Sequence, residues 1–290
     1  MNDKKYELLE NDSIKFGGAT LHRIRALCDF DNVKKGDLGG YIQSEDNLSH
    51  EGDCWVFGNA RVHGNALIYG NARLHGNALI YGNARLHGNA LISGDARIYG
   101  DALIYDNVRV SGSAVICGDA RIYGNALIYD NVRVSGSACI LGNAQIYDKA
   151  RVYGNAQVFD NARIYGNACI YDNVHVSGTA EICGEAEIYG NAEVFDNARV
   201  FDNAYISGNA KLGKYAYITN NKNFITIGPI GSRSDYITFY KTKDKGIYVC
   251  CGCFNDSIEK FEEAVKHTHG DNRYAKEYMD VIKYIKCKYN

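Results

Sequence analysis

The segment Gly58-Asn59-Ala60-Arg61-Val62-His63 is the first of 26 consecutive six-residue repeats that occupy residues 58–213. The first position is Gly or Asp in every copy, the third is Ala or Val, and the fifth is always Ile, Val or Leu. The fourth and sixth positions vary in size and charge. A strict short period predicts a solenoid, in which each repeat is one structural unit stacked on its neighbours.

Each constant position of the repeat has a physical reason. Gly followed by Asn tolerates positive φ, so the chain can turn a corner there. Side chains alternate across a strand, so positions 3 and 5 share one face and positions 4 and 6 share the other. The small and branched residues therefore face a packed interior, and the variable residues face outward. Because one repeat buries almost nothing alone, stacked coils must supply the core.

The spacing of small and aliphatic residues resembles that of the hexapeptide-repeat left-handed β-helix proteins. In Ile68-Tyr69-Gly70-Asn71-Ala72-Arg73 an aliphatic residue is followed by a small residue four positions later. The resemblance implies a mainly β fold, a single-stranded left-handed parallel β-helix in which three repeats form one coil. The 26 repeats would then make about 8–9 coils.

The regions outside the strict repeats are expected to cover the exposed strand edges at the two ends of a solenoid. Residues 1–45 are non-repetitive and predict an N-terminal β cap, with a strand at Ala19–Leu27 and a loop at Lys34–Gly40. The six-residue register extends weakly back into residues 46–57, so the predicted β-helix spans residues 46–219.

Residues 220–290 predict a small C-terminal α+β module. Alternating or β-rich segments at 224–227, 236–240 and 247–251 indicate three strands. Helices are expected at about 258–267 and 272–287, the first behind an Asn-Asp-Ser start signal. We expect this β-β-β-α-α module to pack on the last coil.

Three N-terminal segments and the following repeats also resemble a YdcK-like group of bacterial and phage hexapeptide-repeat proteins. These segments are Leu21–Leu27, Gly36–Ile42 and Ser44–Ser49, and the repeats follow Trp55. Members of the group are labelled as transferases or polymer-forming proteins. The resemblance implies no demonstrated reaction.

Composition excludes several classes of partner. The net charge is −2 and no segment is strongly basic, so nucleic acid is an unlikely partner. No apolar run reaches the length of a membrane span. The N-terminus lacks the apolar region of a signal peptide, so we expect a cytoplasmic protein. The ten cysteines form no regular framework and are expected to be free thiols.

Histidines in the repeats are the weak candidates for catalysis. The acyltransferases that share this repeat use a histidine as general base and cover the acceptor with an inserted loop. His63, His75 and His87 occur in every second repeat, which is two-thirds of a coil apart, so they should lie on three different faces. They cannot converge on one catalytic metal within a chain. Since no insertion interrupts the repeats either, catalysis would require a subunit interface.

Aromatic residues at position 6 form two predicted ladders on the exterior. Such ladders stabilise neighbouring strands, and they are also candidate surfaces for a partner or for self-association into a homo-oligomer. Arginines at position 4 recur in every second repeat and are therefore spread over different faces. The ladder residues are Tyr129, Tyr147 and Tyr165 on one face and Tyr153, Tyr171 and Tyr189 on another.

The C-terminal module contains two further candidate groups. Cys251, Cys253, His267 and His269 are weak candidates for a metal site, although their spacing matches no standard zinc signature and a simple strand end explains them as well. Arg233, Lys241 and Lys243 could contact an anion, or could belong to a solvated hairpin.

These patterns favour a non-enzymatic structural or interaction protein without a cofactor. The solenoid would be a rigid scaffold whose outer faces and C-terminal module contact a protein partner or another copy of the chain. One alternative is an acyltransferase-like enzyme with its site at a subunit interface. The other is an antagonist, of phage or host origin, that binds another macromolecule.

Overall fold

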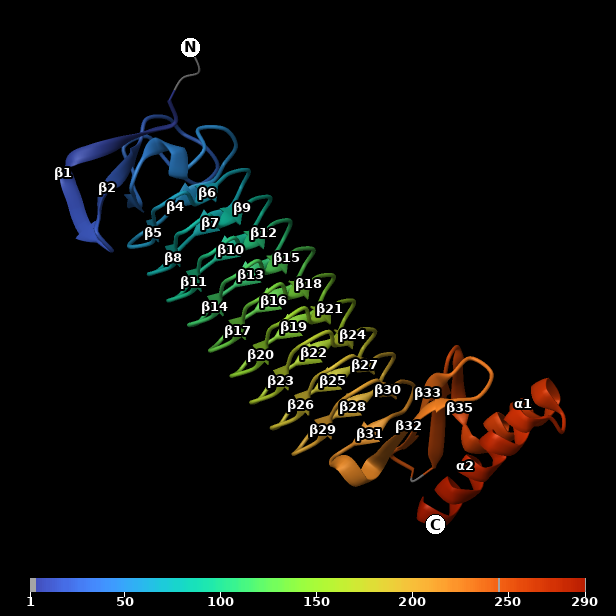
Figure 1. The fold of residues 1–290 in the computed structure, drawn as a ribbon. Coiled ribbons are helices and arrows are strands. Elements are labelled where there is room, and N and C mark those ends of the chain that lie inside the picture. Colours follow the sequence, from blue (N-terminus) through green and yellow to red (C-terminus); the bar gives the residue numbers. More distant parts are fainter. Residues whose placement is uncertain (1–3, 245, 290) are drawn as a thin grey trace. The chain divides into compact units, whose positions relative to one another are not determined.

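The computed structural model describes residues 4–244 and 246–289. The chain divides into two compact units, residues 1–155 and residues 156–290, which are described one at a time. Figure 1 shows coils of short strands in both units, an antiparallel hairpin near the N-terminus and two helices at the C-terminus.

The first unit begins with three longer strands, β1 (Tyr6–Phe16), β2 (Ala19–Ala26) and β3 (Leu38–Ile42). β1 and β2 form an antiparallel hairpin, and β2 pairs antiparallel with β3. β3 then pairs in parallel with β5, the strand of the first repeat. The loop predicted at Lys34–Gly40 is therefore wrong in its last part, because Leu38 already begins the strand on which the coils stack.

A short 3-10 helix, η1 (Glu45–Asn47), leads into the coils of the first unit. Their strands are β4 (Trp55–Val56), β5 (Arg61–Val62), β6 (Leu67–Ile68), β7 (Arg73–Leu74), β8 (Leu79–Ile80), β9 (Arg85–Leu86), β10 (Leu91–Ile92), β11 (Arg97–Ile98), β12 (Leu103–Ile104), β13 (Arg109–Val110), β14 (Val115–Ile116), β15 (Arg121–Ile122), β16 (Leu127–Ile128), β17 (Arg133–Val134), β18 (Cys139–Ile140), β19 (Gln145–Ile146) and β20 (Arg151–Val152).

The pairing register confirms a coil of three repeats with three faces. Arg97 pairs in parallel with Leu79 on one side and with Val115 on the other, each three repeats away along the chain. The N–H groups of positions 2, 4 and 6 donate to carbonyls of the next coil, as from Arg61 to Ala78 at 2.8 Å. Each strand covers only positions 4 and 5 of its repeat, and positions 1 and 2 form the turns.

The interior follows the predicted pattern. Position 3 (Ala or Val) and position 5 (Ile, Val or Leu) are at most 1 % exposed through the repeats. Every Asp at position 1 has positive φ, as do the glycines there. At Gly112 an added Cβ would lie 2.6 Å from the backbone N of Asp130 in the next coil. Asp at this position instead accepts from the next coil, as Asp106 does from Gly124 N–H at 3.1 Å.

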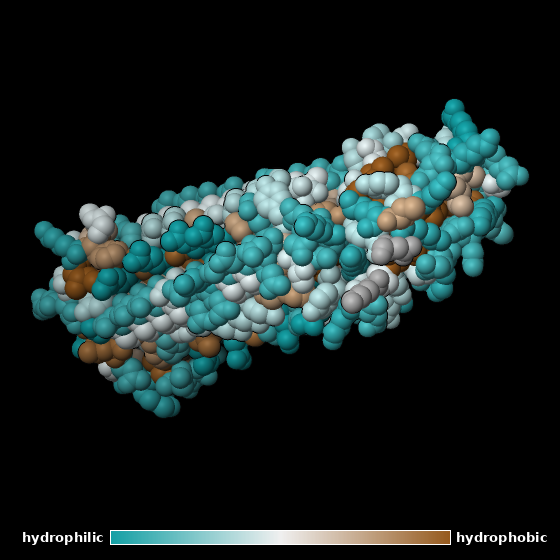
Figure 2. Space-filling view, turned by 90° about the horizontal axis from the view of Figure 1, so that it is seen from below, coloured by the Kyte–Doolittle hydropathy of each residue, from teal (hydrophilic) through white to brown (hydrophobic). Residues whose placement is uncertain are grey.

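The outside of the coils carries two kinds of ladder. Asn side chains at position 2 hydrogen-bond from coil to coil, as in Asn89 to Asn107 and Asn107 to Asn125. Rings at position 6 stack, as in Tyr81 on Tyr99 with centroids 4.8 Å apart. Hydrophilic residues predominate on the face seen in Figure 2, and apolar ones form small separate areas.

The second unit continues the same coil geometry to residue 218. Its coil strands are β21 (Gln157–Val158), β22 (Arg163–Ile164), β23 (Cys169–Ile170), β24 (His175–Val176), β25 (Glu181–Ile182), β26 (Glu187–Ile188), β27 (Glu193–Val194), β28 (Arg199–Val200), β29 (Tyr205–Ile206), β30 (Lys211–Leu212) and β31 (Tyr217–Ile218).

The two units together contain about 10 turns, more than the 8–9 expected from the strict repeats. The difference arises because β3, β4 and β31 lie outside residues 58–213 and still pair in parallel with repeat strands. The mainly β solenoid is thus confirmed, and its left hand stays a prediction from the resemblance. No helix among the described residues is long and apolar enough to cross a membrane.

After η2 (Asn221–Asn223) the chain forms the C-terminal module. An antiparallel sheet contains β32 (Phe224–Ile230), β33 (Asp235–Lys241), β34 (Ile247–Cys251) and β35 (Phe254–Ser257) in that order. Two helices follow, α1 (Ile258–His269) and α2 (Arg273–Tyr289). Ser257 caps α1 by accepting from Lys260 N–H, as its sequence signal predicted. The strand β35 was missed, because Phe254–Ser257 resembles a turn before the helix.

The module packs on the last coils of its own unit, as predicted. The N–H of Lys211 donates to the Thr238 hydroxyl at 3.0 Å. Ala216 forms an antiparallel bridge with Thr242. The sheet and the two helices enclose a separate core around Phe239, Phe261 and Tyr278. This core is where the candidate site lies.

Candidate functional site

The C-terminal module contains a hollow of about 240 Å³ between its sheet and its helices. The β32–β33 turn contributes the polar Ser232 and Arg233, and Thr268 and His269 lie across the space on α1. Phe254 and the α1 residues Phe261, Ala264 and Val265 form an apolar wall. Cys251, Cys253, Asp235 and Tyr278 complete the lining.

Turns and helix faces bring these side chains together. Ser232 and Arg233 lie in the turn between β32 and β33, and Cys253 lies in the turn between β34 and β35. Gly231 allows the first turn to lie against α2. A Cβ on Gly231 would be 1.8 Å from the Tyr278 hydroxyl, and its φ is +71. Only glycine fits this position without displacing the Tyr278 ring.

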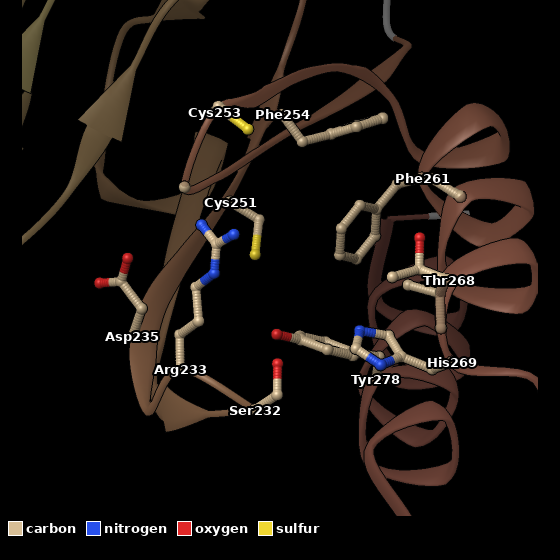
Figure 3. A pocket seen from close by; sticks show the side chains of 13 residues that line it. Ser232, Arg233, Asp235, Cys251, Cys253, Phe254, Phe261, Thr268, His269 and Tyr278 are labelled. Atoms are coloured by element: carbon tan, nitrogen blue, oxygen red, sulfur yellow. The ribbon is translucent and has the colours of Figure 1, made fainter. Parts of the chain in front are cut away.

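Two polar groups point into the hollow. Figure 3 shows the Arg233 guanidinium and the Tyr278 hydroxyl directed into the space in front of Cys251, while Asp235 points away from it. Among residues 4–244 and 246–289, no hydrogen bond or ion pair to Arg233 is present. The His269 ring lies 5.7 Å from the Tyr278 ring, centroid to centroid. An exposed cation thus faces the same space as a buried hydroxyl, which also hydrogen-bonds the Cys251 thiol.

The thiol and the phenol of the hollow stay protonated near neutral pH. Burial raises the pKa of Cys251, although the hydrogen bond from Tyr278 and the charge of Arg233 act in the opposite direction. Burial, followed by the neighbouring Cys251, raises the pKa of Tyr278 to about 12. A protonated thiol is a poor nucleophile and a poor metal ligand. The arrangement therefore suits binding better than covalent chemistry.

The apolar wall is built from rings that pack at an angle to one another. The Phe254 and Phe261 centroids are 5.1 Å apart, and the Phe261 and Tyr278 rings meet edge to face at 5.7 Å. Phe261 and Val265 belong to the module core and are at most 5 % exposed. A ligand that places a carboxylate at Arg233 could therefore place an apolar group against this wall.

The hollow gathers residues that the sequence had placed in two separate groups. Cys251, Cys253 and His269 from the weak metal candidates line it together with Arg233 from the anion candidates. His267 is exposed on α1 and is not part of the lining. In the described part of the chain, no three His, Cys, Asp or Glu residues are placed to hold a metal ion.

The other two lysines proposed with Arg233 lie elsewhere. The Lys241 ammonium lies over the Tyr289 ring, 4.9 Å from its centroid. Lys243 lines a different hollow with Tyr215 and Tyr248. The three residues therefore lie apart, because the β33–β34 connection carries Lys243 away from the β32–β33 turn, and their contact with an anion stays a prediction.

The three histidines considered for catalysis are outward-facing members of ring stacks. His63 stacks on Tyr81 at 5.1 Å, His75 on Phe57 at 4.2 Å, and His87 on Tyr69 at 4.5 Å. They follow β5, β7 and β9, which belong to three different sheets, as their spacing in every second repeat predicted. Burial lowers the pKa of His63, and burial together with Arg73 lowers that of His75.

One stacked pair of each predicted tyrosine ladder lies within a single unit. Tyr129 stacks on Tyr147 with centroids 5.0 Å apart, and Tyr171 stacks on Tyr189 at 5.2 Å. The Tyr171 hydroxyl also donates to Glu187. Tyr153 is 36 % exposed at the same repeat position. Tyr165 also occupies position 6, after β22.

Several lining residues were not predicted. Tyr278 was expected only as part of the helix at about 272–287, and Phe254 lay outside the expected strands and helices. Ser232 and Thr268 were not among the candidate site residues. The signal that could have identified the site is Gly231 directly before Ser232 and Arg233, since a glycine between a strand end and an arginine indicates a close backbone approach.

One family of known proteins matches the repeats. The sequence model described as YdcK Beta solenoid repeat matches residues 102–118, 120–136, 144–160, 156–171 and 162–178. This match confirms the resemblance drawn from the hexapeptide pattern. No curated protein matches the chain.

Proposed function

We propose that the protein is a non-enzymatic scaffold in which the β-solenoid carries a C-terminal recognition module, and that this module binds a carboxylate of a protein partner. The observation that carries the proposal is the hollow in the module. Arg233 and Tyr278 point into the same space there, beside an apolar wall that includes Phe254 and Phe261. This combination suits an acidic group next to a large apolar side chain.

The repeats support the scaffold part of the proposal. Their interior is filled by residues at positions 3 and 5, so it leaves no room for a substrate between the described coils. The histidines that could serve as a base are stacked on rings of three separate sheets. Catalysis by one chain would require groups that converge, and these do not.

The affinity of the hollow should depend on its single cation. A charge-assisted hydrogen bond contributes about 1.5–3 kcal/mol, which corresponds to roughly tenfold or more in Kd. Removal of the Tyr278 hydroxyl should cost less, because the ring and its packing stay in place.

The test selects random peptides against the full chain and then measures binding of the enriched peptides by calorimetry. We expect enrichment of an acidic group beside a large apolar residue. Arg233→Gln should weaken binding about tenfold, and Tyr278→Phe should weaken it by a smaller factor. Lys276→Gln is the matched control, since it removes one positive charge from an exposed site of α2 outside the hollow.

Two peptide forms separate the possible sources of the carboxylate. Loss of binding when the C-terminal acid is replaced by an amide would identify a chain terminus. Unchanged binding of the amide would identify an internal Asp or Glu. The proposal is abandoned if no acidic peptide is enriched, or if enriched peptides bind the Arg233→Gln variant as well as the original chain.

A further inference from the structure

Three arginines of the first unit lie in one row, separated by apolar residues. Arg61, Arg97 and Arg133 occupy β5, β11 and β17. The strands between them, β8 and β14, place Leu79 and Val115 in the same row. Neighbouring strands lie about 4.8 Å apart, so consecutive arginines are separated by roughly 9.6 Å.

The row forms the floor of a hollow of about 540 Å³. Polar side chains at position 2 form one flank, among them Asn77, Asp95 and Asn131. The β1–β2 hairpin contributes Phe16 at one end, where the Arg61 guanidinium lies over its ring, 4.7 Å from the centroid. The hollow therefore has both a floor and an end wall.

Stacked rings at position 6 run along the other side of the row. Phe16 meets His63 at 5.8 Å, His63 meets Tyr81 at 5.1 Å, and Tyr81 meets Tyr99 at 4.8 Å. These residues follow the same strands that carry Arg61, Leu79 and Arg97. An aromatic ridge thus accompanies the β5, β8 and β11 part of the row, and Cys117 and Ser135 take the same position after β14 and β17.

The positive charge of the row is not balanced within the described residues. Arg61, Arg97 and Arg133 have no carboxylate partner there, and Nε of Arg61 is buried without a hydrogen-bond acceptor. The one acid of the lining, Asp95, accepts from Asn77 Nδ2 at 2.9 Å. Arg133 also pairs directly with Arg151 in the next coil, and like charges opposite one another are destabilising. An external anion would relieve this repulsion.

The spacing distinguishes among extended anions. Alternate residues of a β-strand recur every 6.8 Å or so, and phosphates of a nucleic-acid strand are closer still at about 3.4 Å along the axis. A polyproline II helix has three residues per turn and rises about 3.1 Å per residue, so one side recurs every 9.3 Å or so. The polyproline II value is the nearest to the roughly 9.6 Å between the arginines, and every third phosphate, at about 10.2 Å, comes next.

We propose that this groove binds an acidic peptide in the polyproline II conformation with a carboxylate at every third residue. The carboxylates pair with Arg61, Arg97 and Arg133. The intervening residues lie on Leu79 and Val115 and against the ridge of His63, Tyr81 and Tyr99, as proline-rich segments lie in aromatic grooves. This site is separate from the hollow of the C-terminal module and would mediate a second contact.

The test measures binding of synthetic Glu-Pro-Pro repeats to the full chain by calorimetry at low ionic strength. Two control peptides carry the same number of residues: a Gln-Pro-Pro repeat without charge, and a Glu-Pro repeat whose carboxylates occur at every second residue. We expect the Glu-Pro-Pro repeat to bind at least about tenfold more tightly than either.

A matched pair of variants locates the site on the molecule. The triple substitution Arg61→Gln, Arg97→Gln and Arg133→Gln should reduce affinity for the Glu-Pro-Pro repeat at least about tenfold. The triple substitution Arg85→Gln, Arg109→Gln and Arg121→Gln removes the same charge from the other two faces and should change affinity less than about twofold. Circular dichroism confirms that both variants keep their β content.

Several outcomes would overturn the proposal. Equal losses in the two triple variants would mean that binding depends only on net charge. Equal affinity for the Glu-Pro repeat would mean that spacing is not recognised. Tighter binding of a uronate-containing polysaccharide or of single-stranded oligothymidylate would assign the groove to another class of polyanion. None of these results depends on Arg233, so this proposal and the proposed function can fail independently.

Discussion

In the hexapeptide repeats the buried side chains are an Ala and an Ile, Val or Leu from each repeat, whereas the C-terminal module buries large rings from several elements. Each repeat packs on its equivalents in the coils before and after it, as Ile98 does between Ile80 and Ile116. The module instead packs Phe239 and Phe261 between a sheet and two helices. The repeat core is therefore uniform, and the module core is assembled from unlike parts.

This difference explains where recognition is possible. A uniform interior made of small and branched residues is filled everywhere, so ligands can only reach the outer faces of the coils. A core of large rings leaves space where a helix and a sheet do not match, and Arg233 and Tyr278 line that space. Irregular packing thus accounts for the hollow in the module, whereas the groove is an outer face of the coils that Phe16 of the β1–β2 hairpin closes at one end.

The largest effect is expected from truncating the module core. Phe239→Ala should lower the free energy of unfolding of the module by about 3–5 kcal/mol, because it leaves a cavity that the rings cannot refill. Hydrogen exchange should then show faster exchange in β32–β35, α1 and α2, with the coils of the first unit unchanged.

The repeat core provides the control for this substitution. Ile80→Val removes one methylene and should cost about 0.5–1.5 kcal/mol, spread over the neighbouring coils. If Phe239→Ala accelerates hydrogen exchange in the first unit as much as in the module, the repeat core and the module core do not unfold independently. The contrast between the two cores would then be wrong.

An intermediate effect is expected at the turns of the coils. Gly118 has a φ of +69, and an added Cβ would lie 2.8 Å from the carbonyl oxygen of Gly136. Gly118→Ala should destabilise the first unit by about 1–2 kcal/mol, because Ala disfavours positive φ. Gly118→Asp should cost less, since the carboxylate can accept the N–H of the next coil, as Asp106 does. Thermal unfolding of both variants measures this difference in stability. A larger loss of stability in Gly118→Asp than in Gly118→Ala would contradict this account.

The smallest effect concerns the histidines in the ring stacks. Burial lowers the pKa of His63 and His75, so the unfolded chain takes up protons before the folded chain as pH falls. The stability of the first unit should therefore decrease as pH falls below about 6.5, the pKa of an unfolded histidine. The double substitution His63→Gln and His75→Gln should make this decrease shallower, by at most a few degrees of Tm.

The measurement for this prediction is Tm against pH between neutral and mildly acidic conditions. Substitution of His267, which is exposed on α1, is the control and should leave the slope unchanged. An equally steep decrease in the double variant would assign the pH dependence to other groups.

Much of the fold could be predicted from the sequence because each repeat position has one physical role. Ala at position 3 and Ile at position 5 can only be inside, and the coil of three repeats then decides which residues share a face. The three histidines were correctly placed on different sheets for this reason. β4 and β31 lie inside the predicted span of residues 46–219, where the register is weaker, but β3 was assigned to the N-terminal cap because it lacks the repeat signature and pairs with β5 through backbone groups.

The sites could be predicted only in part. Arg233, Cys251, Cys253 and His269 were singled out by residue type, but the space that joins them depends on how α2 lies against the β32–β33 turn. No local pattern shows that Tyr278 contributes a hydroxyl there. The groove was also missed, since each arginine was compared with the next arginine along the chain, which lies on another face, and Phe16 comes from a distant hairpin.

The row of alternating arginines has a consequence for how the chain can change in length. Arg and Leu alternate at position 4 with a period of two repeats, and a coil contains three, so the two periods coincide only every six repeats. As long as the alternation holds, every face carries an arginine in every second coil. Where it lapses, at Gln145 before Arg151, Arg133 meets another arginine in the next coil. A duplication or deletion of a single hexapeptide within the alternating part would thus preserve the core and bring like residues together once on each of the three faces.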